Sequence, residues 1–380
     1  MKKICFIYML MGIVLIQNSH AQNFVYPASK TVDSADVFFG KKYPDPYRWL
    51  EHLDKEETKA WFKAQNNYSS EIIDKMPLLS TIIEEQKAAD KVRKTKYGGI
   101  IKKDVGYFYE KRTPEQQKLK LYFKANGNST EVQLFDPETF QNNKFEMFGW
   151  GVSDNGKEIF LNLSEPGKEI GKVYLLNVST KKIEGDSLIN GRAEYWVPGS
   201  DKQFFYNLSA SNDIHSMDAT LNTKEMLYNN GKPVEILSNI NNPELTIKPE
   251  EYPFVVYFEN GNYMFGGKGT VDNNQQLYYA PKNELLKGKI NWKIFSSKVD
   301  KITQGLCVGN DIYVLCTKNN SNFDVVKYTI SSEGIGKPTV IYSPKTEVIQ
   351  SLSRTKNYIL LGGIKDGIAS VNTKNRFSKW

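Results

Sequence analysis

The stretch Val152–Leu161, with the sequence VSDNGKEIFL, joins a tight turn to an apolar strand. Asn-Gly favours two-residue hairpin turns, because both residues tolerate a positive φ. The Ile-Phe-Leu run that follows is typical of a strand buried in a sheet. Comparable turns, each followed by apolar or aromatic residues, recur along the chain at Asp104, Asn155, Ser200, Asn260, Asn310 and Lys356.

These six turns are spaced at intervals of 51, 45, 60, 50 and 46 residues. Four-stranded propeller blades recur at roughly 40–50 residues. An alternating β-sandwich is the alternative fold, but such a long and regular period favours a propeller. The 22 Tyr and 20 Phe residues also suit β structure. We therefore expect a mainly β protein with a β-propeller over residues 96–380.

A short α-helical segment is predicted before the propeller, within residues 22–95. It opens with the stretch Asp45–Glu51, DPYRWLE, in which Arg48 and Glu51 can satisfy each other or nearby backbone groups. Apolar periodicity then predicts helices over Lys55–Lys75 and Leu78–Lys94.

The first of these helices has a start signal and an apolar face. Asp54, followed three residues later by Glu57, predicts a capping box. Helical spacing puts Trp61, Tyr68 and Ile72 on one face, with Ala64 or Gln65 between them. We expect this face to pack against a neighbouring domain rather than to bind a ligand, because aromatic stripes are usually core.

The amino terminus, Met1–Ala21, is predicted to be a secretory signal peptide. It has a basic start at Lys2 and Lys3, an apolar run over Ile4–Ile16, and a small-residue cleavage site at Ser19–Ala21. The apolar run is short for a membrane span, although an uncleaved anchor is the alternative. We expect the mature chain to begin near Gln22 and to be soluble, in the periplasm or secreted.

The charge of the chain gives little support to a nucleic-acid-binding function. Cleavage removes two lysines and no acid, so the net charge falls from +7 to +5, which is mild for this length. The densest basic run is predicted to be a solvated helix face and turn, not a nucleic-acid site. Its members are Lys87, Lys91, Arg93, Lys94, Lys96, Lys102 and Lys103.

Cys307 and Cys316 are the cysteines that remain after cleavage. They flank the probable turn Gly309–Asp311 without being symmetric about it, so direct cross-strand pairing is disfavoured. A disulfide is possible in an oxidising compartment, but two buried free thiols are the favoured interpretation.

Several segments resemble the prolyl oligopeptidase family. They are residues 33–40 (DSADVFFG), 45–51 (DPYRWLE), 56–61 (EETKAW) and 64–66 (AQN) near the start, and the strand and turn residues of the first blades up to about Asn207. Past Asn207 the resemblance depends mainly on spacing and on residues 313–317 (YVLCT). The resemblance implies a serine peptidase that cleaves short peptides after proline, whose hydrolase domain is capped by a seven-bladed β-propeller.

The length of the chain does not accommodate all of that architecture. The sixth turn, at Lys356, leaves 24 residues before Trp380, enough for strands at Tyr358–Leu361 and Gly367–Val371. We therefore expect an incomplete propeller of about five to six blades. The expected domains are the signal peptide 1–21, the extended and helical segment 22–95 and the truncated propeller 96–380, with the C-terminal α/β-hydrolase domain absent.

No catalytic residue is expected, because the family's Ser-Asp-His triad would lie beyond the propeller. The elbow G-x-S-x-G does not occur, and the nearest look-alike, Gly151–Gly156, has the wrong spacing and the character of a hairpin turn. His52 and His215 are predicted to be surface or structurally satisfied histidines rather than general bases.

Cofactor and metal sites are not predicted either. Residues Gly266–Gly269 do not match a P-loop and are interpreted as a strand-end turn. Too few His and Cys residues exist for zinc spacing. The pairs Glu56-Glu57, Glu84-Glu85 and Glu250-Glu251 are predicted to lie on helix or loop surfaces. A propeller glycosidase would need paired carboxylates near the central channel, which sequence cannot identify. The sequon at Asn162 is attributed to chance.

Two functions therefore remain. The first is a truncated, exported prolyl oligopeptidase-like peptidase whose isolated propeller region is inactive, with short proline-containing peptides as family substrates and the missing hydrolase domain as natural partner. On this hypothesis the helical segment is poorly anchored. The alternative is a stand-alone extracytoplasmic propeller acting as a binding or interaction module.

Overall fold

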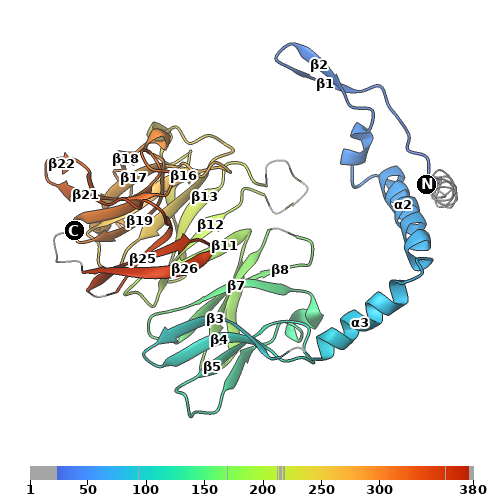
Figure 1. Ribbon diagram of the computed structural model, residues 1–380, viewed down its shortest axis with the longest axis horizontal. Helices are drawn as coiled ribbons and strands as arrows, with labels where there is room; N and C mark the ends of the chain where they lie inside the picture. The colour runs from blue at the N-terminus through green and yellow to red at the C-terminus, as the bar shows by residue number, and fades with distance from the viewer. Residues whose placement is uncertain are drawn as a thin grey trace, which may run out of the picture. The chain divides into compact units, whose positions relative to one another are not determined.

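The computed structural model describes residues 24–92, 94–168, 170–211, 213, 216, 219–355 and 357–375. The predicted signal peptide Met1–Ala21, His215 and the sixth turn residue Lys356 lie outside these ranges. The chain forms two compact units, one up to Arg93 and one from Lys94 onward (Figure 1).

The first unit contains a hairpin, a short 3-10 helix and two α-helices. Their bounds are Ala35–Phe38 for β1, Lys41–Pro44 for β2, Arg48–Glu51 for η1, Glu56–Asp74 for α2 and Leu79–Lys91 for α3. Both predicted helices are confirmed, each within a few residues of its expected ends.

Trp49 organises this unit. Its ring is buried, its Nε1 donates to the Lys30 carbonyl at 2.8 Å, and its own carbonyl accepts from the Thr58 hydroxyl at 3.2 Å. The Arg48–Glu51 pair, one of the two options expected for these residues, does not form: Arg48 pairs with Asp36 and, at 3.1 Å, with Asp45. The hairpin supplies Asp36, and sequence spacing could not reveal that the hairpin folds back over η1.

The capping box predicted for α2 is also wrong. The N-cap is Lys55, which makes no side-chain cap hydrogen bond, so Asp54 lies one residue too early to cap the helix. Glu57, the expected partner of Asp54, instead accepts from Lys30 Nζ at 2.9 Å. The Glu57 carboxylate therefore forms a long-range ion pair with Lys30 instead of the local capping box.

The apolar face of α2 contacts the extended segment that precedes β1. Trp61 Nε1 donates to the Ser29 hydroxyl and Gln65 Nε2 to the Pro27 carbonyl, both at 3.0 Å. The Tyr68 ring lies 5.5 Å from that of Tyr26. The contacts that the structure shows for this face lie within its own unit, and packing against a neighbouring domain stays a prediction.

The described residues of the second unit form six antiparallel sheets, which are the blades of a β-propeller. Within each sheet, strands that follow one another in the sequence pair side by side, except that β23 pairs with β21. The first sheet contains β3 (Lys96–Lys103), β4 (Gly106–Arg112), β5 (Lys120–Lys124) and β6 (Val132–Phe135). The second contains β7 (Glu146–Val152), β8 (Glu158–Ser164), β9 (Lys172–Asn177) and β10 (Lys182–Ile189). The third contains β11 (Gly191–Trp196), β12 (Gln203–Leu208), β13 (Lys224–Asn229) and β14 (Lys232–Leu237).

The last three sheets follow the same order (Figure 1). They are β15 (Tyr252–Tyr257), β16 (Tyr263–Gly269), β17 (Gln276–Pro281) and β18 (Lys293–Ser296); β19 (Ile302–Val308), β20 (Asp311–Cys316) and β21 (Asp324–Ser331), with β22 (Gly334–Ile335) and β23 (Thr339–Tyr342) both paired to β21; and β24 (Val348–Arg354), β25 (Tyr358–Lys365) and β26 (Ile368–Asn375). Single-turn 3-10 helices lie at Phe140–Asn143, Pro243–Leu245, Lys282–Glu284 and Lys298–Asp300.

The predicted period is confirmed. Five of the six predicted turns lie wholly in the described residues, and each joins the first strand of a sheet to the second. The apolar run after each turn, Tyr358–Leu361 included, falls in the second strand. The mainly β fold and the propeller are therefore as expected, with six sheets of which the sixth has three strands within the described part of the chain.

Buried clusters between successive sheets hold the blades together, because the second strands bury both faces. On β12, Phe204 packs against the second sheet while the adjacent Phe205 packs against the fourth. On β16, Met264 joins the core shared with the third sheet and Phe265 the core shared with the fifth. This explains the continuous apolar runs, since neighbouring residues of a strand face opposite ways.

Asn162 joins the second sheet to the third through hydrogen bonds to the backbone. Its Nδ2 donates to the Ala193 carbonyl and its Oδ1 accepts from the Ala193 N–H, both at 2.8 Å in a buried position. Trp196 adds a third bond across this junction, since its Nε1 donates to the Gly151 carbonyl at 2.9 Å. The sequon at Asn162 thus belongs to a structural residue in the core.

Replacing Asn162 with Leu is expected to lower the free energy of unfolding by about 2–4 kcal/mol, because both backbone groups of Ala193 lose their partner while remaining buried. Urea denaturation measures the change. The control is Asn128→Ala, at an exposed turn position, where we expect less than about 0.5 kcal/mol. Equal losses in the two variants would contradict the role given to Asn162.

Candidate functional site

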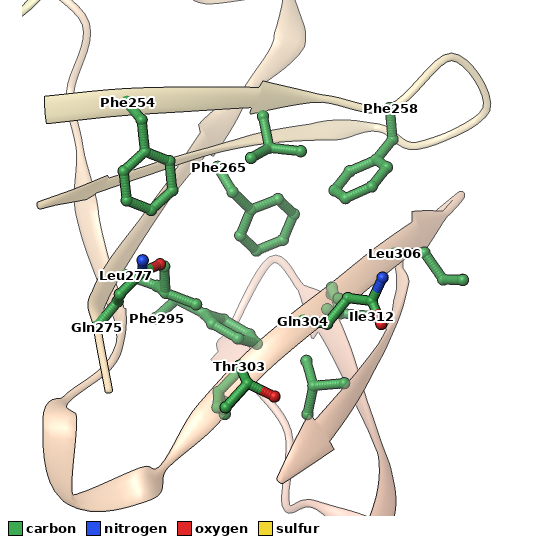
Figure 2. A pocket seen from close by; sticks show the side chains of 14 residues that line it. Phe254, Phe258, Phe265, Gln275, Leu277, Phe295, Thr303, Gln304, Leu306 and Ile312 are labelled. Atoms are coloured by element: carbon green, nitrogen blue, oxygen red, sulfur yellow. The ribbon is translucent and has the colours of Figure 1, made fainter. Parts of the chain in front are cut away.

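An aromatic pocket lies between the fourth and fifth sheets (Figure 2). Its volume is about 110 Å³, and six strands, β15 to β20, contribute to it. In Figure 2 the rings of Phe254, Phe258 and Phe265 point into one space above Phe295. The remaining walls are Val256, Leu277, Ile302, Leu306, Ile312 and Val314, with Gln275, Thr303, Gln304 and Gly305.

The pocket exists because of a regular alternation on β15. Phe254 and Val256 are two residues apart, so they share a face of the strand, and Phe258 follows just beyond its end. Phe254 is paired with Gly267 on β16, where a Cβ atom would lie 2.1 Å from the Phe254 ring. Glycine therefore lets the ring lie across the neighbouring strand.

The interpretation of Gly266–Gly269 as a strand-end turn is accordingly wrong. All four residues are buried within β16. Gly269 faces Tyr252 as Gly267 faces Phe254, with its Cβ position 2.7 Å from the Tyr252 ring. The glycines make room for aromatic side chains of β15, and no sequence rule for turns distinguishes that use of glycine from a bend.

Polar groups occur where the pocket meets the first strand of the fifth sheet. Thr303 and Gln304 of β19 are exposed. Gln304 Oε1 accepts from the Leu352 N–H at 2.8 Å, which joins the fifth sheet to the sixth and leaves the Nε2 group of Gln304 as a donor. An apolar pocket with a few polar groups at its mouth suits binding, and it contains no titratable group for acid–base chemistry.

Lys268 and Glu251 form a buried ion pair on the side of the fourth sheet that faces the third. Their side chains are 9% and 6% exposed and lie 3.3 Å apart. Lys268 Nζ also donates to the carbonyls of Leu245 at 3.1 Å and Thr246 at 2.8 Å. The surface position predicted for Glu251 is therefore wrong, because the lysine brought in by β16 draws the carboxylate inward.

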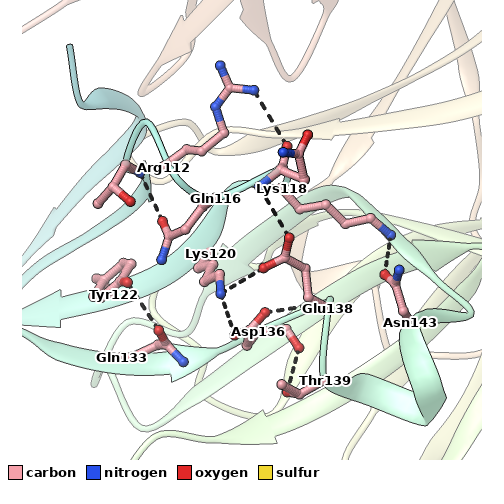
Figure 3. Close-up of polar contacts among 12 residues, drawn as sticks. Arg112, Gln116, Lys118, Lys120, Tyr122, Gln133, Asp136, Glu138, Thr139 and Asn143 are labelled. Atoms are coloured by element: carbon pink, nitrogen blue, oxygen red, sulfur yellow. Dashed lines mark hydrogen bonds and ion pairs between the residues drawn. The ribbon is translucent and has the colours of Figure 1, made fainter. Parts of the chain in front are cut away.

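A second polar cluster lies at the corner of the first sheet (Figure 3). Lys120 Nζ contacts Asp136 at 2.7 Å and Glu138 at 2.8 Å. The hydrogen bond from Lys120 is the main cause that holds the pKa of Glu138 below its usual value. Asp136 and Glu138 also accept backbone N–H groups, of Glu138 and Gln117 respectively, so this cluster orders a turn and leaves little capacity for a ligand.

The triad look-alike has a structural role. Ser153 is buried in the β7–β8 turn, where its hydroxyl contacts Asn155 at 2.9 Å and accepts from the Glu158 N–H at 3.0 Å. His52 follows η1 in the first unit and is exposed. The hydrogen bonds of the Ser153 side chain that the structure shows lie within its turn, and His215 lies outside the described ranges.

Cys307 and Cys316 are free and buried, as predicted. Cys307 is paired across the sheet with Ile312 and Cys316 with Ile302, so the two thiols do not face each other. Burial raises the pKa of Cys307 to about 11, which keeps it a protonated thiol at neutral pH.

Within the described residues, no three His, Cys, Asp or Glu side chains gather as a metal site would require. None of the helices described is both long and apolar enough to cross a bilayer.

Comparison with known proteins places the fold. The family model for the prolyl oligopeptidase N-terminal β-propeller domain matches residues 26–379. The prolyl endopeptidase of Elizabethkingia miricola is 25% identical over 332 residues, which cover 84% of this chain and 44% of that protein. The enzyme of the same name from Elizabethkingia meningoseptica is 23% identical, over 96% of this chain and 51% of that protein.

Solved structures show the same fold. One of a pair of prolyl endopeptidases aligns with a TM-score of 0.77 at 18% identity, over 93% of this chain and 51% of that chain. Prolyl oligopeptidase B from Galerina marginata, bound to a 35-residue substrate, aligns with a TM-score of 0.78 at 15% identity, over 92% and 52%. This chain spans about half the length of the relatives it matches, and it belongs to the prolyl oligopeptidase family.

Proposed function

We propose that this chain supplies the propeller part of an exported prolyl-endopeptidase-like serine peptidase, the part that controls which peptides reach the catalytic residues. The observation that carries this proposal is the family match over residues 26–379. The relatives are named for cleavage of prolyl peptides, which motivates short proline-containing peptides as the substrate class. Export rests on the pattern of Met1–Ala21.

We do not assign the catalytic residues for peptide cleavage to these 380 residues. The sequence contains no G-x-S-x-G elbow. Acyl transfer by a serine needs that nucleophile beside a histidine and an oxyanion hole. Ser153 lies in a turn, where other groups of the turn occupy its hydroxyl. The contribution of this chain is therefore access and binding, and a hydrolase domain of the same family is the partner that fits it.

The purified 380-residue polypeptide is expected not to hydrolyse a Gly-Pro fluorogenic peptide, because it lacks the nucleophile elbow. Release of the fluorophore is followed against buffer, with the Elizabethkingia miricola prolyl endopeptidase as the positive control. Turnover that rises in proportion to the concentration of the polypeptide, through successive purification steps, would refute this assignment.

The pocket between the fourth and fifth sheets favours a second function, peptide binding by the propeller itself. An apolar protein cavity of about 150 Å³ accommodates benzene. The observed 110 Å³ therefore suits one small ring, and the pyrrolidine ring of proline is of that size. Thr303 and Gln304 line the same pocket and are exposed, so we expect their polar groups to bond the backbone of the bound peptide.

Phe254→Ala is expected to weaken binding of a Gly-Pro peptide roughly 5- to 30-fold, because about 1–2 kcal/mol of apolar contact is lost. Isothermal titration calorimetry measures the dissociation constant, with a Gly-Ala peptide as the ligand control. Tyr358→Ala is the protein control, since it removes an exposed aromatic ring on β25, outside the pocket. Equal affinities of wild type and Phe254→Ala for the Gly-Pro peptide would rule out this site.

A further inference from the structure

The junction between the third and fourth sheets contains an unpaired carboxyl group, that of Glu225. The residue lies on β13 and is 0% exposed, and neither of its side-chain oxygens has a hydrogen-bond partner. Leu227, two residues further along the strand, belongs to the apolar core shared by these two sheets. Strand alternation therefore directs Glu225 toward the same junction.

An anionic carboxylate is strongly disfavoured there, because an unpaired buried charge has a large free-energy cost. Burial, the largest cause, raises the pKa of Glu225 well above its ordinary value, and the negative charge of Glu194 raises it further. The Val255 backbone N–H acts in the opposite direction and is the smallest influence. Glu225 is accordingly protonated at neutral pH.

The Tyr195 side chain bridges the junction beside the Glu225 carboxyl group, and we call this bridge the Tyr195 strap. Tyr195 of β11 donates its hydroxyl to the Val255 carbonyl at 2.7 Å, and it accepts from the Tyr257 N–H at 3.0 Å. Val255 and Tyr257 belong to β15, so the strap joins the first strands of the two sheets. The charges of Glu225 and Glu194 both act on Tyr195, which places the strap in the field of the two acids.

The other ionisable groups around Glu225 do not neutralise it. On β11, burial raises the pKa of Glu194 and the charge of Arg192 lowers it, and Arg192 is not among the charges that act on Glu225. On β13, Lys224 is paired with Glu235 of β14 at 2.7 Å. Tyr257 and Tyr278 of the fourth sheet belong to the same junction, and burial raises the pKa of both, that of Tyr278 to about 12. Lys268 of β16 bonds the Leu245 carbonyl at this junction, but its charge is paired with Glu251. Tyr206 of β12 lies in the core toward the second sheet, and burial raises its pKa to about 12.

We propose that the protonation state of Glu225 controls the junction between the third and fourth sheets, which we call the seam. When Glu225 carries its proton, the Tyr195 strap holds the seam closed. When Glu225 loses the proton to solvent, the seam opens. The charge created on Glu225 needs water. Exposed Glu194 marks the side from which water reaches the junction, and its charge repels the new anion. Hydration of Glu225 then competes with the two hydrogen bonds of Tyr195.

The direction of the pH dependence follows from the raised pKa. A group whose pKa is higher in the closed state contributes stability that is complete below its open-state pKa, about 4.3, and is lost as pH rises through the closed-state pKa. Because opening releases one proton, the opening equilibrium increases by up to about tenfold per pH unit within that window.

Hydrogen exchange at the Tyr257 amide tests the seam, because that N–H donates to Tyr195. In the wild type, exchange corrected for the intrinsic base-catalysed rate is expected to speed up at least tenfold between pH 5 and pH 8, from the linkage above. In Glu225→Gln, or in Glu225→Met if that variant folds better, the corrected rate is expected to stay flat. Glu146→Gln, an exposed acid on β7, is the matched control and should behave as wild type.

Two variants separate the strap from the proton. Glu194→Gln removes the like charge and should slow exchange at Tyr257 at pH 8 relative to wild type. Tyr195→Phe removes the strap and should speed exchange at every pH while the pH dependence persists. A flat profile in the wild type, or a wild-type profile in both Glu225 variants, would overturn the proposal; neither result bears on peptide binding in the aromatic pocket.

Discussion

The whole propeller depends on strands that bury both of their faces. Adjacent residues such as Phe204 and Phe205 enter two different cores, one on each side of the sheet. A sheet of this kind cannot be stable alone, because half of its apolar side chains need the preceding sheet and half the following one. Each blade therefore depends on its neighbours, and the order of blades follows the order of the sequence.

That arrangement limits where polar groups are tolerated. The first strand of each sheet has an edge without a partner strand, so side chains from the neighbouring blade satisfy parts of it. Asn162, Tyr195 and Gln304 each bond backbone groups across a different junction. Glu225 is the ionisable side chain among the buried polar groups of the described residues that have no hydrogen-bond partner, and its proposed ionisation gives one seam a dependence on protons.

The sequence predicted what depends on local period and turn chemistry, and missed what depends on distant partners. The turn at Asn155 and the strand after it follow from residues that are adjacent in the chain. The pairing of Arg48 with Asp36, the inward turn of Glu251 and the role of Gly267 all depend on which strands become neighbours. The pocket had a visible signal, the alternation of Phe254, Val256 and Phe258, but nothing marked its opposite wall on β19.

The location of the pocket follows from the same constraint. The junction of the fourth and fifth sheets has large rings opposite glycines. The Phe254 ring lies over Gly267, where a Cβ atom would lie 2.1 Å from it, so no side chain at this position of β16 fills the space. The apolar pocket is then a consequence of the residues at these two positions, and an apolar ring is the ligand that we propose for it.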